Sequence, residues 1–139
     1  MTGRTPRHPG FGSGPPTGPA VLIAVVGTAG QAGHAIAAGA DMIDATGLSD
    51  QGLAAIRARH PGARLWAGLP AAVDADGPGV TAGGQAAPVA AVVARAAVLT
   101  WLGTPAIRTR HVLPVRRAID MTSTIAGARL PSLTTRGLG

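Results

Sequence analysis

The chain has 139 residues and a mass of 13.6 kDa, which is enough for one domain of ordinary size. All twelve basic residues are Arg, all six acidic residues are Asp, and Lys, Glu, Asn, Cys and Tyr are absent. These absences exclude disulfide frameworks, thiolate zinc sites, lysine Schiff bases and glutamate general bases. Any acid–base or nucleophilic chemistry must therefore use Asp, His, Arg, Ser or Thr.

The net charge of +6 is distributed unevenly along the chain. Residues 20–90 carry three Arg and five Asp, a net −2, whereas residues 91–139 carry seven Arg and one Asp, a net +6. An all-Arg basic composition is typical of GC-rich coding, which accounts for the high pI without any binding function. Nucleic-acid binding by the C-terminal third is the other interpretation. It is not favoured, because aromatic residues for base stacking are nearly absent and no known module pattern occurs.

The chain alternates between apolar strand-like runs and helical segments. Residues 1–19 are rich in Gly and Pro and predict a disordered tail, and residues 128–139 predict another loose tail. Between them, the patterns predict four strands, at 20–26, 41–46, 64–68 and 106–110. They also predict helices at 30–39, at 49–59 ending before His60, at 86–102 as a buried packing helix, and at 114–126, with a flexible break at 74–85.

This order predicts an α/β domain over residues 20–127, with about four parallel βα units. The longest wholly apolar run, 20–26, is far shorter than the roughly 20 residues of a membrane span, and no signal peptide is apparent. We therefore expect no membrane contact and a cytoplasmic location. Parallel sheets bind ligands at the carboxyl ends of their strands, so the residues just after each strand are the candidate site residues.

The stretch Arg108-Thr109-Arg110-His111 is the most informative of these strand ends. Strand alternation predicts that Arg108 and Arg110 lie on the same side, beside the N-terminus of the last helix. Guanidinium pairs and a helix N-terminus suit phosphate or carboxylate, so the stretch predicts an anion site. The alternative is an exposed basic strand end in an Arg-rich chain.

Asp44 lies in an apolar strand, where burying an unpaired carboxylate is costly. It is expected either to face the ligand end and pair with Arg108, or to accept hydrogen bonds from its own loop. Ser49 and Asp50 are N-cap candidates for the following helix.

Other polar and aromatic residues are assigned structural roles. The Gly-rich stretch 27–33 lacks the spacing of a dinucleotide-binding fingerprint and is interpreted as a strand-to-helix turn that could still approach an anion. The His residues lack metal-ligand spacing, so no metal site is predicted. Asp74 and Asp76 are expected to be solvated, and Trp66 and Trp101 to be core anchors.

Two blocks of the sequence resemble the dihydropteroate synthases, a pterin-binding family. Residues 39–49, GADMIDATGLS, resemble that family's second strand and loop. Residues 106–112, AIRTRHV, and 116–121, RRAIDM, are similar to its last strand and helix, where an R-x-H-D-V motif occurs. The helix 86–102 resembles the helix before that strand.

The resemblance implies a (β/α)8 barrel fold. It also implies an enzyme that condenses a dihydropterin pyrophosphate with p-aminobenzoate, assisted by Mg2+. By match, Asp44 takes the strand Asp, Ser49 lies in the following loop, and Arg108 takes the Arg position. Arg110 stands at the His position, with His111 one place later. These five residues are the candidate ligand or anion site, and the implied ligand is a pterin or a phosphate.

The departures from the family imply an incomplete active site. A full barrel needs about 250 residues, whereas this chain supplies about four units, a partial (β/α) barrel. The family's Asn and Lys are missing, and its third-strand Asp has no counterpart in residues 65–69. Half a barrel leaves open strand edges. The sequence therefore predicts a homo-oligomer or a protein partner, and a non-catalytic interaction protein is the alternative function.

Overall fold

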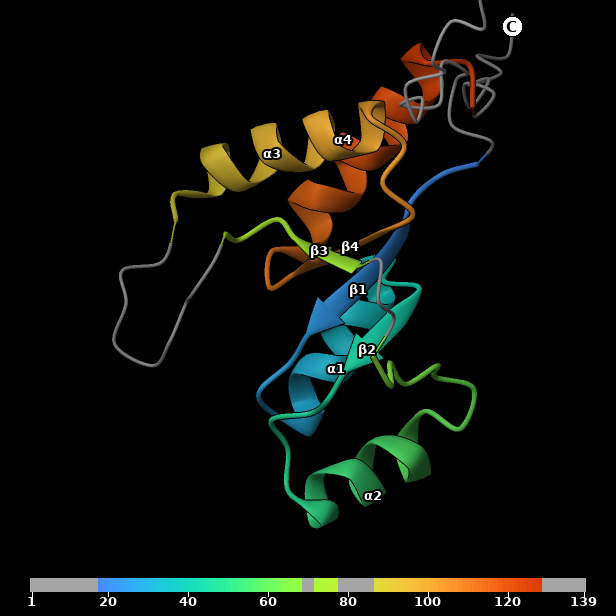
Figure 1. Cartoon of the computed structure of the whole chain (residues 1–139). Coiled ribbons are helices and arrows are strands. Elements are labelled where there is room, and N and C mark those ends of the chain that lie inside the picture. Colours follow the sequence, from blue (N-terminus) through green and yellow to red (C-terminus); the bar gives the residue numbers. More distant parts are fainter. Residues whose placement is uncertain (1–17, 69–71, 78–86, 129–139) are drawn as a thin grey trace, which may run out of the picture.

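The structure, a computed structural model, describes residues 18–68, 72–77 and 87–128. Most of the tails predicted at 1–19 and 128–139 and of the break predicted at 74–85 lies outside these residues. The described elements alternate along the chain (Figure 1). They are β1 (Val21–Val25), α1 (Ala29–Ala37), β2 (Met42–Asp44), α2 (Asp50–Arg59), β3 (Ala72–Asp74), α3 (Val89–Trp101), β4 (Ala106–Thr109) and α4 (Val112–Ile125).

The four strands form one parallel sheet in the order β2-β1-β4-β3. In the central pairing, Ile23 of β1 is in register with Arg108 of β4, and Asp74 of β3 is in register with Arg108 from the other side. The prediction of an α/β fold with a parallel, partial (β/α) barrel-like sheet is confirmed.

The third strand is not where the sequence predicts it. Residues 64–68 make only a single parallel bridge, between Leu65 and Ile43, at the outer edge of β2. The third strand of the sheet is β3, on the opposite edge beside β4, in a stretch whose Asp and Gly residues are typical of a loop. Pairing with β4 holds these three residues extended, and such a tertiary contact overrides weak local propensity.

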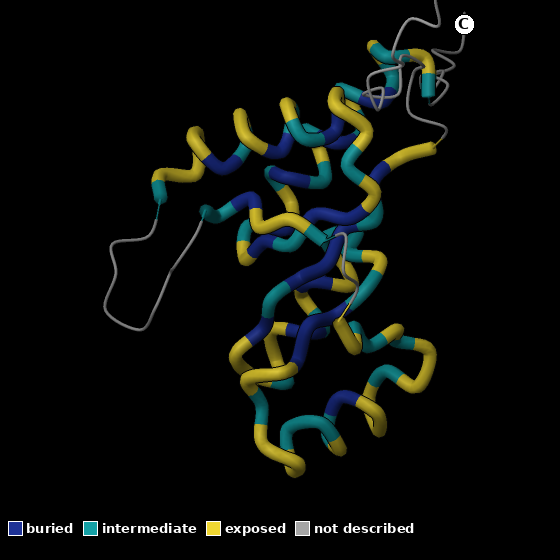
Figure 2. Tube along the Cα trace, viewed as in Figure 1, coloured by how far each residue is buried: buried dark blue, intermediate teal, exposed yellow. Residues whose placement is uncertain are grey.

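All four helices pack against one face of the sheet. The buried apolar cluster contains alternate residues of the strands, among them Leu22, Ala24 and Ile107, together with residues of every helix. Ala32 of α1, Ile56 of α2, Val92 of α3 and Val115 of α4 belong to it. In Figure 2 these buried segments run along the sheet and the helix sides that face it. The opposite face of the sheet, which we call the inner face, carries the remaining alternate residues, including Ile23, Asp44 and Arg108.

Helix boundaries follow the signals in the sequence. Thr28 caps α1 by accepting a hydrogen bond from the amide of Gln31, and Ser49 caps α2 in the same way from Gly52. Gly39 follows α1 with φ at +96°, a conformation that glycine adopts without strain. No helix within the described ranges is long and apolar enough to cross a membrane.

Two predictions about packing are wrong for the C-terminal half. The helix predicted to be buried, α3, presents Val98, Trp101 and Leu102 to solvent, so it is covered on one side only. Trp101 is 58% exposed and is not a core anchor. The sheet covers only the inward side of α3, and nothing in residues 18–68, 72–77 or 87–128 covers the outward side.

Candidate functional site

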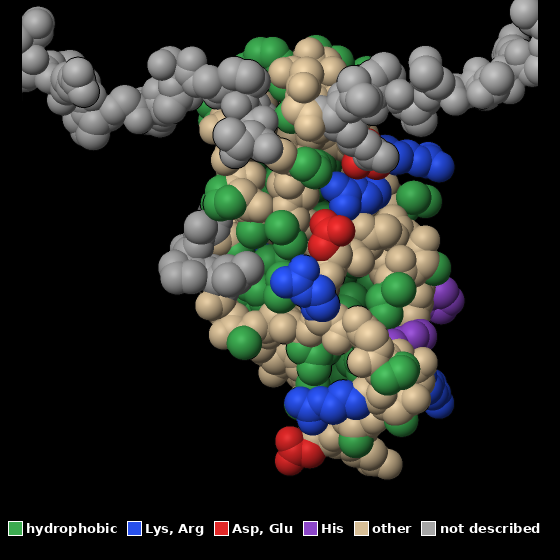
Figure 3. Space-filling view, turned by 90° about the vertical axis from the view of Figure 1, so that its right-hand side faces the viewer, with side chains coloured by type: hydrophobic (Ala, Val, Ile, Leu, Met, Phe, Trp, Pro, Cys, Tyr) green, Lys and Arg blue, Asp and Glu red, His purple; other side chains and the backbone are tan. Residues whose placement is uncertain are grey.

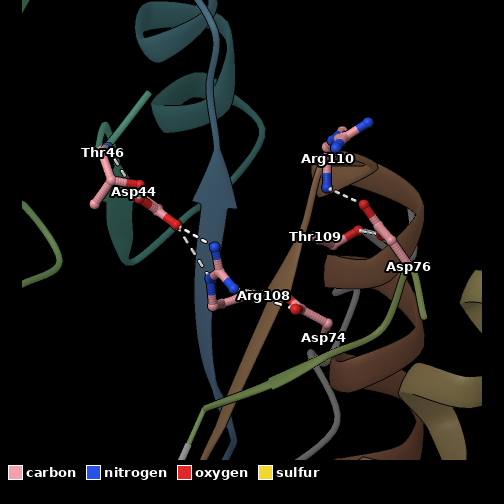
Figure 4. A network of polar contacts seen from close by, with 7 residues as sticks. All are labelled: Asp44, Thr46, Asp74, Asp76, Arg108, Thr109 and Arg110. Atoms are coloured by element: carbon pink, nitrogen blue, oxygen red, sulfur yellow. Dashed lines mark hydrogen bonds and ion pairs between the residues drawn. The ribbon is translucent and has the colours of Figure 1, made fainter. Parts of the chain in front are cut away.

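A polar network crosses the inner face and has Arg108 at its centre (Figure 4). The Arg108 Nε donates to Asp44 Oδ2 at 3.1 Å, and its Nη2 makes an ion pair with the same oxygen. On the other side, Arg108 Nη1 donates to both oxygens of Asp74, at 3.0 and 3.2 Å. One guanidinium from β4 thus ties β2 to β3 across the sheet.

Asp44 is an ionised group inside the fold. Its side chain is fully buried, and Oδ1 accepts hydrogen bonds from Thr46 Oγ1 at 2.7 Å and from the Thr46 amide at 3.0 Å. Burial acts to raise the pKa of Asp44, but the bonds from Thr46 and the Arg108 guanidinium outweigh it and hold that pKa below its ordinary value. Both roles foreseen for Asp44, pairing with Arg108 and bonding to its own loop, are present together.

The indole ring of Trp66 lies over the Arg108 guanidinium, with Arg108 Cζ 4.6 Å from the ring centroid. Trp66 follows the Leu65 bridge, which is three interstrand spacings from β4, about 14 Å in a flat sheet. The long side chains and the curl of the barrel-like sheet close this distance. Trp66 therefore stacks on the ion network, whereas the sequence favoured a core anchor.

Asp74 and Asp76 are bonded to β4, which the sequence did not predict, although Asp74 is exposed to solvent as predicted. Asp74 pairs with Arg108. Asp76 Oδ1 accepts from Thr109 Oγ1 at 2.6 Å, and its Oδ2 accepts from the Arg110 amide at 3.0 Å. Thr109 Oγ1 in turn accepts from the amide of His111 at 3.0 Å. Asp76 therefore shapes the turn from β4 into α4, and hence the direction in which the Arg110 side chain leaves the sheet.

Arg110 and Arg108 do not share one site, although the alternation of an extended strand predicts it. β4 ends at Thr109, so Arg110 lies past the regular pleat. In Figure 4, Arg108 points toward Asp44 and Asp74, whereas the Arg110 side chain points away from both. Arg110 instead lines a cavity at the carboxyl ends of the strands.

This cavity has a volume of about 670 Å³ and lies over the ends of β1, β2 and β4. Its lining residues come from the strand ends, from α1 and from the first turn of α4: Val25, Val26, Gly27, Gln31, His34, Ala35, Thr46, Gly47, Arg110 and Val112. The volume is in the range of small-molecule sites, about 300 to 1,000 Å³. The cavity contains no carboxylate among these lining residues, so its charged groups are cationic or titratable.

Two helix N-termini border the cavity. Gln31 belongs to the first turn of α1, where its Oε1 accepts from the Gly27 amide at 2.7 Å and orders the loop. Val112 is the first residue of α4. Helix N-termini carry a partial positive charge and favour anions. Together with Arg110, they make the cavity suited to a small anionic ligand.

The remaining predicted site residues take other places. Ser49 is the N-cap of α2, where its Oγ accepts from the Gly52 amide at 3.3 Å. His111 precedes α4 as its N-cap residue, without a side-chain capping bond. Neither residue lines the cavity.

The sequence reasoning missed His34 and Gln31 as lining residues, whereas Thr46 was among the candidates at the strand ends. His34 and Gln31 lie in α1, downstream of the strand end. The available signal was the Gly-rich stretch 27–33, which contains Gln31 and directly precedes His34.

The acidic residues do not form a site suited to Mg2+. In the described part of the chain, no group of three His or Asp side chains comes together as metal ligands would. The carboxylates nearest one another on the inner face, Asp44 and Asp74, are already bonded to Arg108. A hard cation would have to displace that guanidinium, so the donors present do not fit the Mg2+ that the resemblance implies.

Comparisons of this chain with protein-family models, with curated proteins and with solved structures found no match.

Proposed function

We propose that this chain is a dihydropteroate synthase-like protein that binds a small anionic ligand and lacks a complete synthase site. The observation that carries the proposal is the cavity of about 670 Å³ at the carboxyl ends of β1, β2 and β4, with Arg110 in its lining. This is the edge at which parallel α/β sheets bind ligands. The two sequence blocks that resemble the pterin-binding family supply β2, β4 and the start of α4 among the elements that border the cavity.

The ligand class follows from the charges of the lining. Arg110 supplies planar donors that suit phosphate oxygens, and the first turns of α1 and α4 add a favourable field. His34 adds ring nitrogens that can form hydrogen bonds with a ligand. The apolar side chains of Val25, Val26, Ala35 and Val112 offer a surface for a flat ring. A phosphate or pyrophosphate ester of a pterin has both features.

The polar groups favour a protein that binds the ligand but does not catalyse the condensation reaction. Asp44 is fully buried and is neutralised by Arg108, so its carboxylate is not presented to a ligand in the cavity. Arg108 acts as a positioning residue that holds β2, β4 and β3 together. The missing Asn and Lys positions and the absence of an acidic lining residue leave the cavity without the groups that the family uses for chemistry.

A ligand-dependent melting scan tests this function. The full chain is heated alone and with inorganic pyrophosphate, a pterin, p-aminobenzoate or Mg2+. We expect pyrophosphate and phosphorylated pterin to raise the melting temperature, because a ligand that binds only the folded state stabilises it. Mg2+ alone is expected to have no effect. A scan in which no anion raises the melting temperature would contradict the proposal.

The second candidate function is a non-catalytic interaction or assembly protein. The observation that favours it is the exposed apolar side of α3, with Trp101 at 58% and Leu102 at 67% exposure. A basic nucleic-acid surface is not favoured. On the face shown in Figure 3, the Arg side chains stand apart, with Asp and apolar side chains between them. Single Arg residues neutralised by neighbours give little phosphate attraction.

A further inference from the structure

The outward side of α3 is mostly apolar, and the charged residue of the helix, Arg95, lies exposed at the edge of that side. The helix has 13 residues, and its charged residue, Arg95, turns aside to donate to the carbonyl oxygen of Ala75 at 2.9 Å. Its polar residue, Thr100, is buried and donates to the carbonyl oxygen of Ala96 at 2.8 Å. A helix that is apolar on every side is typical of a position covered on every side. The sheet and α4 cover α3 on one side only.

Six exposed residues of α3 and its C-cap fall on one stripe, which we call the α3 face. It consists of Ala90, Ala91, Ala94, Val98, Trp101 and Leu102. Two other residues of the helix are also exposed: Val89 in its first turn, and Arg95 at the edge of the stripe. The stripe is graded in size along the helix: its first half is alanine, and its second half contains the three bulky side chains. Val98, Trp101 and Leu102 are 57%, 58% and 67% exposed.

We propose that the α3 face is the contact between two copies of this chain, related by a two-fold axis. In a two-fold contact, each copy offers the same patch, and the two α3 helices run antiparallel. An axis passing near Ala96 would set Leu102 against Ala90, Trp101 against Ala91 and Val98 against Ala94. Every bulky side chain would then meet an alanine, so the size gradient makes the α3 face complementary to itself.

The chemistry of the face selects a second copy over a charged partner. The six residues of the stripe are apolar, and the exposed Arg95 at its edge is bonded to the carbonyl oxygen of Ala75. The centre of the face is therefore depleted of charge, as the centre of an interface typically is. The face exposes on the order of 500 Å² of apolar area, against roughly 800 Å² that each partner contributes to a stable interface. Met121 and Ile125 of α4, the helix packed against α3, are exposed by 68% and 66%, and we propose that they contribute to the rest.

Light scattering after size exclusion, over about a hundredfold range of protein concentration, tests this contact with the full chain. The wild type is expected to be a dimer at the upper end. Val98→Arg places a charge at the centre of the face, and Leu113→Arg adds the same charge at an apolar side chain, 46% exposed, in the first turn of α4. We expect Val98→Arg to raise the dissociation constant by at least about 30-fold and Leu113→Arg to leave it unchanged.

Trp101→Ala is the second variant, because it removes a half-exposed side chain and leaves the core intact. Circular dichroism checks that each variant is folded, and if Val98→Arg is not, Trp101→Ala decides with the same expected loss. The proposal is overturned if the wild type stays monomeric throughout, as it would if another protein or residues 129–139 covered the face. A dimer insensitive to both α3 variants, or equally weakened by Leu113→Arg, also overturns it.

Discussion

Replacing Asp44 with Asn removes the negative charge from the inner-face network and keeps the shape of the side chain. The Asp44 side chain is fully buried, and it accepts from Thr46 at 2.7 and 3.0 Å and from Arg108 at 3.1 Å. In the variant, one amide oxygen can still accept from Thr46, but the amide NH2 then faces the Arg108 guanidinium, and two donors oppose each other. The guanidinium loses its principal counter-charge.

The magnitude follows from the burial of the pair. Breaking a buried ion pair by removing one partner costs about 3 to 5 kcal/mol of unfolding free energy. We expect about 3 kcal/mol for Asp44→Asn, because Arg108 keeps its contact with Asp74 and its side chain is 23% exposed. This is a large fraction of the 5 to 15 kcal/mol that is typical of a whole domain.

Urea unfolding followed by circular dichroism measures this cost. The matched control is Asp74→Asn, which makes the same chemical change on the same guanidinium. The Asp74 side chain is 46% exposed, and we expect it to contribute at most about 1 kcal/mol. If Asp44→Asn destabilises the protein no more than Asp74→Asn does, Asp44 is not the buried anchor of the network, and the reasoning is refuted.

Two further predictions concern acid stability and a glycine turn. Burial acts to raise the pKa of Asp44, but its hydrogen bonds and the neighbouring guanidinium outweigh burial and hold that pKa below its ordinary value of 3.8. The ionised Asp44 therefore stabilises the fold fully above about pH 4, and this stabilisation is lost as the pH falls through the lowered pKa. Below pH 4, the unfolding free energy of the wild type should therefore decrease more steeply with falling pH than that of Asp44→Asn. Equal slopes of unfolding free energy against pH in the two proteins would argue against this. Gly39→Ala should cost about 1 to 2 kcal/mol, because Gly39 has φ at +96° and an added Cβ would lie 2.9 Å from Arg116 Cδ. Gly62→Ala, where an added Cβ meets nothing within 4 Å, should change the unfolding free energy by less than about 0.5 kcal/mol; similar costs for the two changes would refute the turn argument.

Local signals in the sequence were sufficient to predict the strands and helices in which they occur. The apolar run 20–26 contains β1, Ser49 caps α2, and Gly39 ends α1 in the left-handed conformation. Each of these depends on residues close in sequence, so the pattern of strands and helices could be predicted. The pairing of Asp44 with Arg108 was also foreseen as one of two roles, because an apolar strand rarely buries a carboxylate without a counter-charge.

Features that depend on tertiary contacts could not be predicted. β3 is a three-residue strand held by pairing with β4, and its own sequence resembles a loop. Asp74 and Asp76 gain partners only because β3 lies beside β4. The divergence of Arg108 and Arg110 depends on β4 ending at Thr109, one residue before strand alternation would place both side chains on the same side. The exact residue at which a strand or helix ends is its least predictable property.

Calorimetric titration of the full chain with inorganic pyrophosphate tests the anion cavity most directly. Arg110→Gln removes the cationic side chain from the cavity lining, and Arg117→Gln removes the same charge from an exposed position of α4 outside that lining. We predict saturable binding to the wild type, affinity reduced at least about tenfold by Arg110→Gln, and affinity unchanged by Arg117→Gln. No heat of binding, or equal losses in the two variants, would contradict the account.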